Sequence, residues 1–160
     1  MTDEFYEINK DIFENREFNK LKNYKHHGIT RYDHCLNVSY LTYKVTRKIC
    51  KNYKEITRAA LLHDFFTDEV EEVNSLKKLI NHPKYALENA KKSFNISKVQ
   101  EDIILSHMFP IGIRIPKYKE SWIVDLIDDY VAVCERGCSF KQEISAAVTF
   151  LFLIIISNIK

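Results

Sequence analysis

Four of the six histidines of this 160-residue chain form a series with two aspartates. The series reads His34, His63, Asp64, His82, His107 and Asp128. Imidazole and carboxylate groups are the usual ligands of catalytic Zn, Fe and Mn ions, and a site for two ions needs about six of them, often with one bridging carboxylate. These residues therefore have the number and the type needed to hold two divalent metal ions.

The spacing of the apolar residues predicts that these ionisable side chains point inward. His34 continues the stripe Val38, Leu41, Val45 and Ile49, which is the spacing of one face of a helix. Most other members of the series follow an apolar residue by one helical turn. A buried ionisable group is costly unless it is paired or binds a metal. Separate core histidines, each bonded to a backbone carbonyl, would explain a single inward histidine better than the whole series.

The order of these residues resembles the HD-domain superfamily of metal-dependent phosphohydrolases. The H…HD…D signature of that superfamily maps onto His34, His63, Asp64 and Asp128, while His82 and His107 match the additional ligands of its dinuclear members. The flanking segments look like an uncharacterised bacterial branch of the superfamily; they are Thr30–His34, Leu61–Phe66, Asn81–Pro83 and Asp102–Pro110. The resemblance covers about residues 26–135.

The resemblance implies a dinuclear centre in which Asp64 bridges the two ions. His34, His63 and Asp128 would then bind one ion, and His82 and His107 the other. Asp64 and His63 are the expected catalytic residues, because such ions lower the pKa of a water and produce a hydroxide that attacks phosphorus. The expected reaction is hydrolysis of a phosphate ester or anhydride, of a nucleotide in particular. Fe and Mn are the first expected metals, with Zn, Co, Ni and Mg as alternatives.

Two other functions stay open. A small group of HD-domain proteins has a similar ligand order but holds a mixed-valent di-iron centre that activates oxygen and cleaves a carbon bond. The third possibility is a non-catalytic ligand-binding module that keeps the HD fold. Such a module would be expected to lack at least one ligand, whereas the series in this sequence is intact.

The last ligand is open to a choice between Asp128 and Asp125. Many members of the superfamily have Ala-Asp-Lys near this position, and here the segment reads Asp-Leu-Ile-Asp-Asp-Tyr over residues 125–130. The preceding Trp122-Ile-Val favours Asp128. Asp125 lies on nearly the same helical face, while Asp129 points elsewhere and is expected to be solvated.

Three basic residues are predicted to bind the substrate. Arg31 stands one helical turn before His34, where it can reach an anion beside the metals. Arg114 and Lys117 lie in a loop that directly follows His107, and loops on a rigid scaffold often carry substrate contacts. The alternative for this loop is a solvated basic connection. His26 and His27 are expected at the surface.

Composition limits the other classes of function. With 46% hydrophobic residues, the 160-residue chain fits a single globular HD domain over residues 1–160. A net charge of +2 argues against a dedicated nucleic-acid binder and is compatible with a phosphorylated small molecule. The cysteines at positions 35, 50, 134 and 138 have no disulfide-framework or zinc-site spacing, so a reducing cytoplasm is expected.

Only three glycines and three prolines occur, and apolar residues recur at steps of three and four, which predicts an all-α helical bundle. Helices are expected near residues 3–22 with a possible break, 33–51, 55–66, 69–80, 83–93, 97–108, 118–136 and 141–158. No strand is predicted. Ser97 with Gln100 predicts a capping box, and Thr30 and Asn81 are candidate N-caps. A glycine at position 137 predicts a break after the Asp128 helix.

The apolar run over residues 144–156 is shorter than the roughly 20 residues of a membrane-spanning helix. The first ten residues are polar and do not resemble a secretory leader. We therefore expect no membrane association. The run is predicted to form a buried C-terminal helix, or the interface of a homodimer, because a helix that is apolar all round must be covered.

Overall fold

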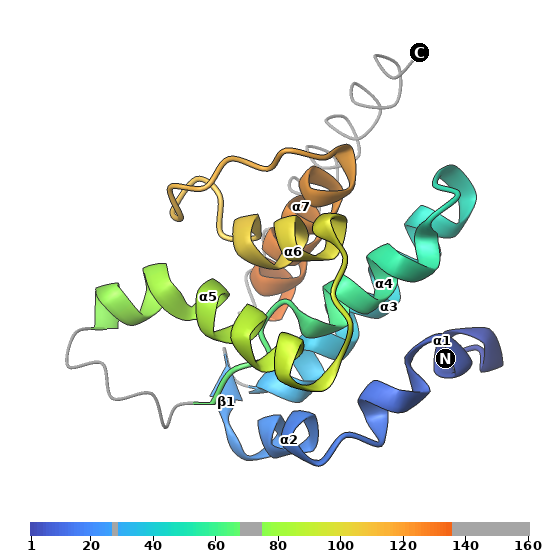
Figure 1. The fold of residues 1–160 in the computed structure, drawn as a ribbon, viewed down its shortest axis with the longest axis horizontal. Coiled ribbons are helices and arrows are strands. Elements are labelled where there is room, and N and C mark those ends of the chain that lie inside the picture. The colour runs from blue at the N-terminus through green and yellow to red at the C-terminus, as the bar shows by residue number, and fades with distance from the viewer. Residues whose placement is uncertain (27–28, 68–74, 136–160) are drawn as a thin grey trace.

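The computed structural model describes residues 1–26, 29–67 and 75–135, which are mostly helical (Figure 1). The helices are α1 (Asp3–Phe13), α2 (Arg16–Asn19), the 3-10 helix η1 (Lys20–Asn23), α3 (Arg31–Ile49), α4 (Tyr53–Leu62), α5 (Ser75–Ser93), α6 (Lys98–Ser106) and α7 (Lys119–Glu135). Strands β1 (Lys25–His26) and β2 (Ile29–Thr30) form one short hairpin. The all-α fold class predicted from the sequence is confirmed.

Helix α3 packs against α4 and α7, and α6 packs against α4, α5 and α7. Two buried apolar clusters lie between these helices. The first includes Leu61 of α4, Ala86 of α5 and Ile104 of α6, and the second includes Ile103 of α6 and Val124 of α7. Several helices contribute to both clusters, so polar residues at their ends and inner faces are brought together inside the molecule.

The predicted helix starts are largely confirmed. The Thr30 hydroxyl accepts a hydrogen bond from the backbone N–H of Asp33 at 3.1 Å, so Thr30 is the N-cap of α3. Ser97 and Gln100 form the predicted capping box at the start of α6. The possible break within residues 3–22 is also confirmed, because α1 ends at Phe13 and the Asn15 side chain caps α2.

Two expectations about secondary structure are wrong. Asn81 is not an N-cap, because α5 continues through Pro83 where two helices were predicted. A proline inside a helix removes one hydrogen bond, but Pro83 and Ala86 are buried here, and packing of this face offsets the loss. The hairpin was not predicted either; it pairs Lys25 with Thr30 and His26 with Ile29, and strands of two residues are too short for a periodic signal.

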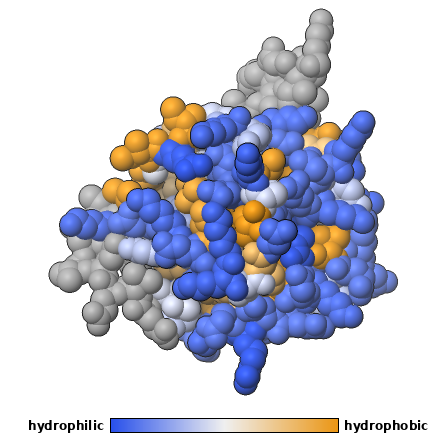
Figure 2. All heavy atoms as spheres, in the orientation of Figure 1, coloured by the Kyte–Doolittle hydropathy of each residue, from blue (hydrophilic) through white to orange (hydrophobic). Residues whose placement is uncertain are grey.

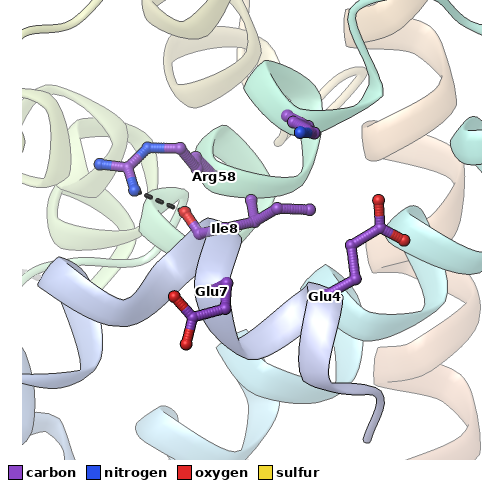
Figure 3. Close-up of a pocket in the computed structure, with 5 residues that line it drawn as sticks. Glu4, Glu7, Ile8 and Arg58 are labelled. Carbon is purple, nitrogen blue, oxygen red and sulfur yellow. Dashed lines mark hydrogen bonds between the residues drawn. The ribbon is translucent and has the colours of Figure 1, made fainter.

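Helix α1 packs against α3 and α4 and forms hydrogen bonds and an ion pair with them. Arg58 of α4 donates to the Ile8 carbonyl at 2.7 Å and binds both carboxylate oxygens of Asp11, at 2.5 and 2.7 Å. Glu4 accepts hydrogen bonds from the hydroxyls of Tyr43 and Tyr53, each at 2.6 Å. Figure 3 shows a surface pocket next to the Arg58–Ile8 hydrogen bond. The pocket is lined by Glu4, Glu7, Ile8, Lys54 and Arg58.

Figure 2 shows a mostly hydrophilic face with hydrophobic residues at the edge where Figure 1 places the loop between α6 and α7. Ile111, Ile113 and Ile115 of this loop are exposed, Ile113 to 88%.

Within the described ranges, no helix is both long and apolar enough to cross a membrane. The predicted helix over residues 141–158, the break at residue 137 and the cysteine at position 138 lie outside the described residues. The cysteines at positions 35, 50 and 134 are free thiols.

Candidate metal centre

The structure brings together all six residues of the His/Asp series, and all six are buried. They come from five helices or helix ends. His34 lies in the first turn of α3, His63 and Asp64 directly follow α4, and His107 directly follows α6. His82 lies in α5 and Asp128 in α7. The H…HD…H…H…D order of the sequence therefore becomes a single cluster in space.

Three overlapping groups within this cluster have ligand atoms that lie within 4.8 Å of one another. The groups are His34 with His63 and Asp64, His63 with His107 and Asp128, and Asp64 with His82 and His107. Each group combines imidazole nitrogens with a carboxylate oxygen, and neighbouring groups share members. Such groups can hold a metal ion, and their overlap gives room for two neighbouring positions.

Each carboxylate faces two imidazoles. Asp128 Oδ1 is 2.9 Å from His34 Nε2 and 3.5 Å from His63 Nε2. Asp64 Oδ1 is 3.2 Å from His82 Nε2 and 3.5 Å from His107 Nε2. The two Nε2 atoms of His82 and His107 are 2.9 Å apart. The cluster thus has a His34–His63–Asp128 end and a His82–His107 end, with Asp64 among the ligand atoms of both.

Contacts on the far side of the imidazole rings fix which nitrogen faces the cluster. His63 Nδ1 donates to the Ala60 carbonyl and His107 Nδ1 to the Ile104 carbonyl, each at 2.8 Å. An imidazole that donates through Nδ1 presents Nε2 as the metal-binding atom. The local cause is the same in both cases: the histidine is the C-cap of its helix and bonds to a carbonyl of the last turn.

Sequence reasoning missed Glu135 at the end of α7. Its Oε2 lies 2.8 Å from His34 Nδ1, so His34 has a carboxylate as its outer partner. Glu135 follows Asp128 by seven residues, which places both on one face of α7. This seven-residue spacing was the one sign in the sequence that Glu135 lies on the same side of α7 as the ligand Asp128.

His82 packs against an aromatic ring. The ring of Phe66 stacks on His82 at 5.0 Å between centroids, with 28° between the planes. The Arg31 guanidinium lies 3.9 Å from the centre of the Phe66 ring, and its Nη1 donates to the Phe66 carbonyl at 3.0 Å. Arg31 is only 5% exposed, so these contacts give it a role in holding the segment that follows Asp64.

The electrostatics of the cluster favour ionised carboxylates. Burial alone would lower the pKa of His34, but its hydrogen bonds to Asp128 and Glu135 raise the pKa to about 10. Burial would raise the pKa of Asp64, but the neighbouring imidazoles, His82 foremost, hold it well below its usual range. The pKa of Asp128 is lowered in the same way by His63 and His34 against the effect of burial. Metal ions would take the place of the imidazolium protons.

The hydrogen bonding of two buried atoms of the cluster indicates whether these residues suit a metal ion. His63 Nε2 lies 3.5 Å from Asp128 Oδ1 and Asp64 Oδ1 lies 3.2 Å from His82 Nε2, but within the described part of the chain neither atom makes a hydrogen bond of suitable geometry. Leaving a buried polar atom without a hydrogen bond costs about 1–3 kcal/mol, so such atoms call for an explanation. Imidazole nitrogens and carboxylate oxygens are the donor set of Fe, Mn, Co and Zn. The residues therefore fit the binding of such ions.

The geometry favours Asp128 over Asp125 at the last position. Asp125 is buried and belongs to none of the groups that can hold a metal among the described residues. Burial, followed by the charges of Asp129 and Asp128, raises the pKa of Asp125 to about 8. Asp125 is thus mostly protonated at neutral pH, in contrast with Asp128. Asp129 is exposed, as expected.

Arg114 and the backbone of Lys117 contact Asp102 of α6. Arg114 Nη2 lies 3.4 Å from Asp102 Oδ1, and Asp102 Oδ2 accepts from the Lys117 backbone N–H and the Ser121 hydroxyl, each at 2.8 Å. These contacts hold the base of the loop in place, while Arg114, with 41% of its side chain exposed, and Lys117 both reach the surface. A substrate role for them stays a prediction. The side chain of His26 and all of His27 lie outside the described part of the structure.

Comparison with protein families gives a match to the HD domain over residues 31–133. The matched range covers most of the chain and contains all six clustered residues. No match was found among curated proteins or among solved structures. The family match, the helical fold and the converging His/Asp series agree, and the chain belongs to the HD-domain family.

Proposed function

We propose that this protein is a metal-dependent phosphohydrolase that cleaves a phosphate ester or anhydride, with a nucleotide as the substrate. The observation that carries the proposal is the buried cluster of four histidines and two aspartates, in which Asp64 Oδ1 and His63 Nε2 make no hydrogen bond among the described residues. Membership of the HD-domain family supports it, since that family consists largely of metal-dependent phosphohydrolases.

Two divalent ions bound by this cluster would supply hydroxide at neutral pH and offset the charge of a phosphoryl group. Asp64 is suited to bridge them, because it lies among the ligand atoms of both ends of the cluster. The Ala60 and Ile104 carbonyls orient His63 and His107 so that each Nε2 faces inward. A nucleophilic serine or cysteine is not part of this proposal.

Substrate binding requires positive charge near the ligands, and we assign it to Arg31, Arg114 and Lys117. Arg31 lies nearest in sequence to a ligand, although its contacts with Phe66 bury most of its side chain. Arg114 and Lys117 lie at the surface, on a loop that begins just after His107. Arginine pairs well with phosphate oxygens through two parallel hydrogen bonds.

Fe or Mn is the proposed metal, and the same donor atoms would accept Zn, Co or Ni. The imidazole-rich donor set also suits a mixed-valent di-iron oxygenase of the HD type, which is the second candidate function. The donor atoms are the same for both, so the distinction depends on the metal's oxidation state and on the reaction.

The test is phosphate release by protein loaded with Mn²⁺ or Fe²⁺, with nucleoside mono- and triphosphates as substrates. We expect metal-dependent release by the natural chain, with a loss of at least about 1,000-fold in Asp64→Ala, because that change removes the proposed bridge. Asp129→Ala is the matched control, since Asp129 is exposed on α7 and should leave the activity intact. Full metal occupancy without phosphate release would contradict the proposal, and a mixed-valent di-iron signal in that sample would favour the oxygenase.

A further inference from the structure

We propose that Glu135 is a positioning residue that makes the His34–Asp128 end of the cluster the tighter of two metal positions. The inference rests on the proposed two-metal site. It adds a carboxylate outside the six ligands and predicts an order of filling: the first ion binds at the His34–Asp128 end, and the second at the His82–His107 end.

Both oxygens of Glu135 are held in place. Oε2 lies 2.8 Å from His34 Nδ1, and Oε1 accepts a hydrogen bond from the Asn37 side-chain amide at 2.9 Å. The side chain is only 8% exposed. A chain of contacts therefore runs from Asn37 through Glu135 and His34 to Asp128, and His34 Nε2 is directed at the cluster.

Among the described residues, the contacts behind the other histidines are with neutral groups. His63 and His107 donate through Nδ1 to backbone carbonyls, which are neutral. His82 stacks on Phe66, and that ring also carries the Arg31 guanidinium at 3.9 Å. In the described part of the chain, the His82–His107 end is thus backed by neutral groups and lies near the Arg31 guanidinium, while His34 at the opposite end is backed by the Glu135 carboxylate.

This difference in charge affects the affinity for cations. A carboxylate that accepts the outer N–H of a ligating histidine orients the ring and makes the inward nitrogen more basic, and loss of such a partner typically weakens metal binding about 10–100-fold. An additional negative charge beside a divalent ion also attracts it directly, and burial reduces the screening of that attraction by solvent. The two positions are therefore unequal even though their ligand types are similar.

The experiment is a titration of the metal-free 160-residue chain with Mn²⁺, in which the free ion is measured by electron paramagnetic resonance. The natural chain should bind two ions in two separate steps. In Glu135→Gln the side chain keeps its size and an acceptor oxygen but loses the charge, so the dissociation constant of the first step should rise about 10–100-fold. The second step should change much less.

Two further variants complete the test. Glu101→Gln is the matched control, because Glu101 pairs with Lys91 at the surface and should leave both steps unchanged. Asn37→Ala keeps the Glu135 charge but removes one of its anchors, and should weaken the first step several-fold. Thermal unfolding of each metal-free variant shows whether the fold is intact. If Glu135→Gln fails to fold, the first binding step of Asn37→Ala tests the inference in its place.

Unchanged binding in both variants would overturn the inference, as would equal weakening of the two steps or weakening of the second step alone. A single binding step with phosphate release would refute unequal metal positions and leave the hydrolase standing. Two steps of which Glu135→Gln weakens the first, without release of phosphate from any nucleotide, would refute the hydrolase and leave the role of Glu135 standing.

Discussion

Replacing Asp125 by asparagine should make the stability of the metal-free protein less dependent on pH. Asp125 is 2% exposed, and within the described residues its Oδ1 makes no hydrogen bond. Burial, with the nearby charges of Asp129 and Asp128, raises its pKa from the usual 3.8 to about 8. Asparagine has nearly the same shape and cannot ionise, so it removes the titration while it keeps the packing.

The sign and size of the effect follow from the two pKa values. The unfolded chain releases the Asp125 proton near pH 3.8, whereas the folded protein keeps it up to about pH 8. The stabilising contribution is therefore complete below pH 3.8 and is lost as the pH rises to 8. Inside this window the free energy of unfolding falls by about 1.4 kcal/mol per pH unit, which gives a loss of about 3 kcal/mol between pH 5 and pH 7.5.

The assay is urea unfolding in the presence of a chelator at pH 5, 6.5 and 7.5. Other groups titrate in both proteins, so the quantity to compare is the difference in unfolding free energy between the natural chain and Asp125→Asn. This difference should shift by about 3 kcal/mol in favour of the variant as the pH rises. Glu88→Gln, at an exposed position of α5, is the control and should show no shift. A difference that stays constant across this range would refute the reasoning.

Three further changes probe other parts of the structure. Asp102→Ala leaves the buried Ser121 hydroxyl without its acceptor and should lower the free energy of unfolding by about 2–4 kcal/mol in urea titrations; a loss below 1 kcal/mol would contradict this. His82→Ala should reduce the bound metal from two ions to one per chain by elemental analysis, and two retained ions would show that the dinuclear assignment is wrong. Arg58→Ala removes the paired contact with Asp11 and should cost about 1–2 kcal/mol, measured as faster proteolysis of α1; unchanged proteolysis would argue against this clasp.

The helical fold and the convergence of the site were predictable because both depend on a periodic pattern. Apolar residues at steps of three and four place the helices, and polar ligands within that pattern must point inward. The order of the six residues matched the family signature, and the structure brings them together. The choice between Asp125 and Asp128 needed the fold, because both lie near one face of α7 and only the packing of α3 shows which of them meets His34.

Other features depend on contacts that no local pattern records. The continuation of α5 through Pro83 depends on the burial of its inner face, which outweighs the proline's local preference. The substrate role of Arg31 stays a prediction, and the contact between its guanidinium and the Phe66 ring needed the fold. Glu135 is separated from His34 by about a hundred residues, so its role became visible only when α3 and α7 lay side by side.

Elemental analysis of chelator-treated protein reloaded with Mn²⁺ or Fe²⁺ tests most directly whether the six His/Asp residues form a two-metal site. We predict two ions per chain in the natural protein and in Asp129→Ala, and fewer than one in Asp64→Ala, because Asp64 lies among the ligand atoms of both ends of the cluster. Absence of bound metal in the natural protein, or two ions retained in Asp64→Ala, would contradict the two-metal site.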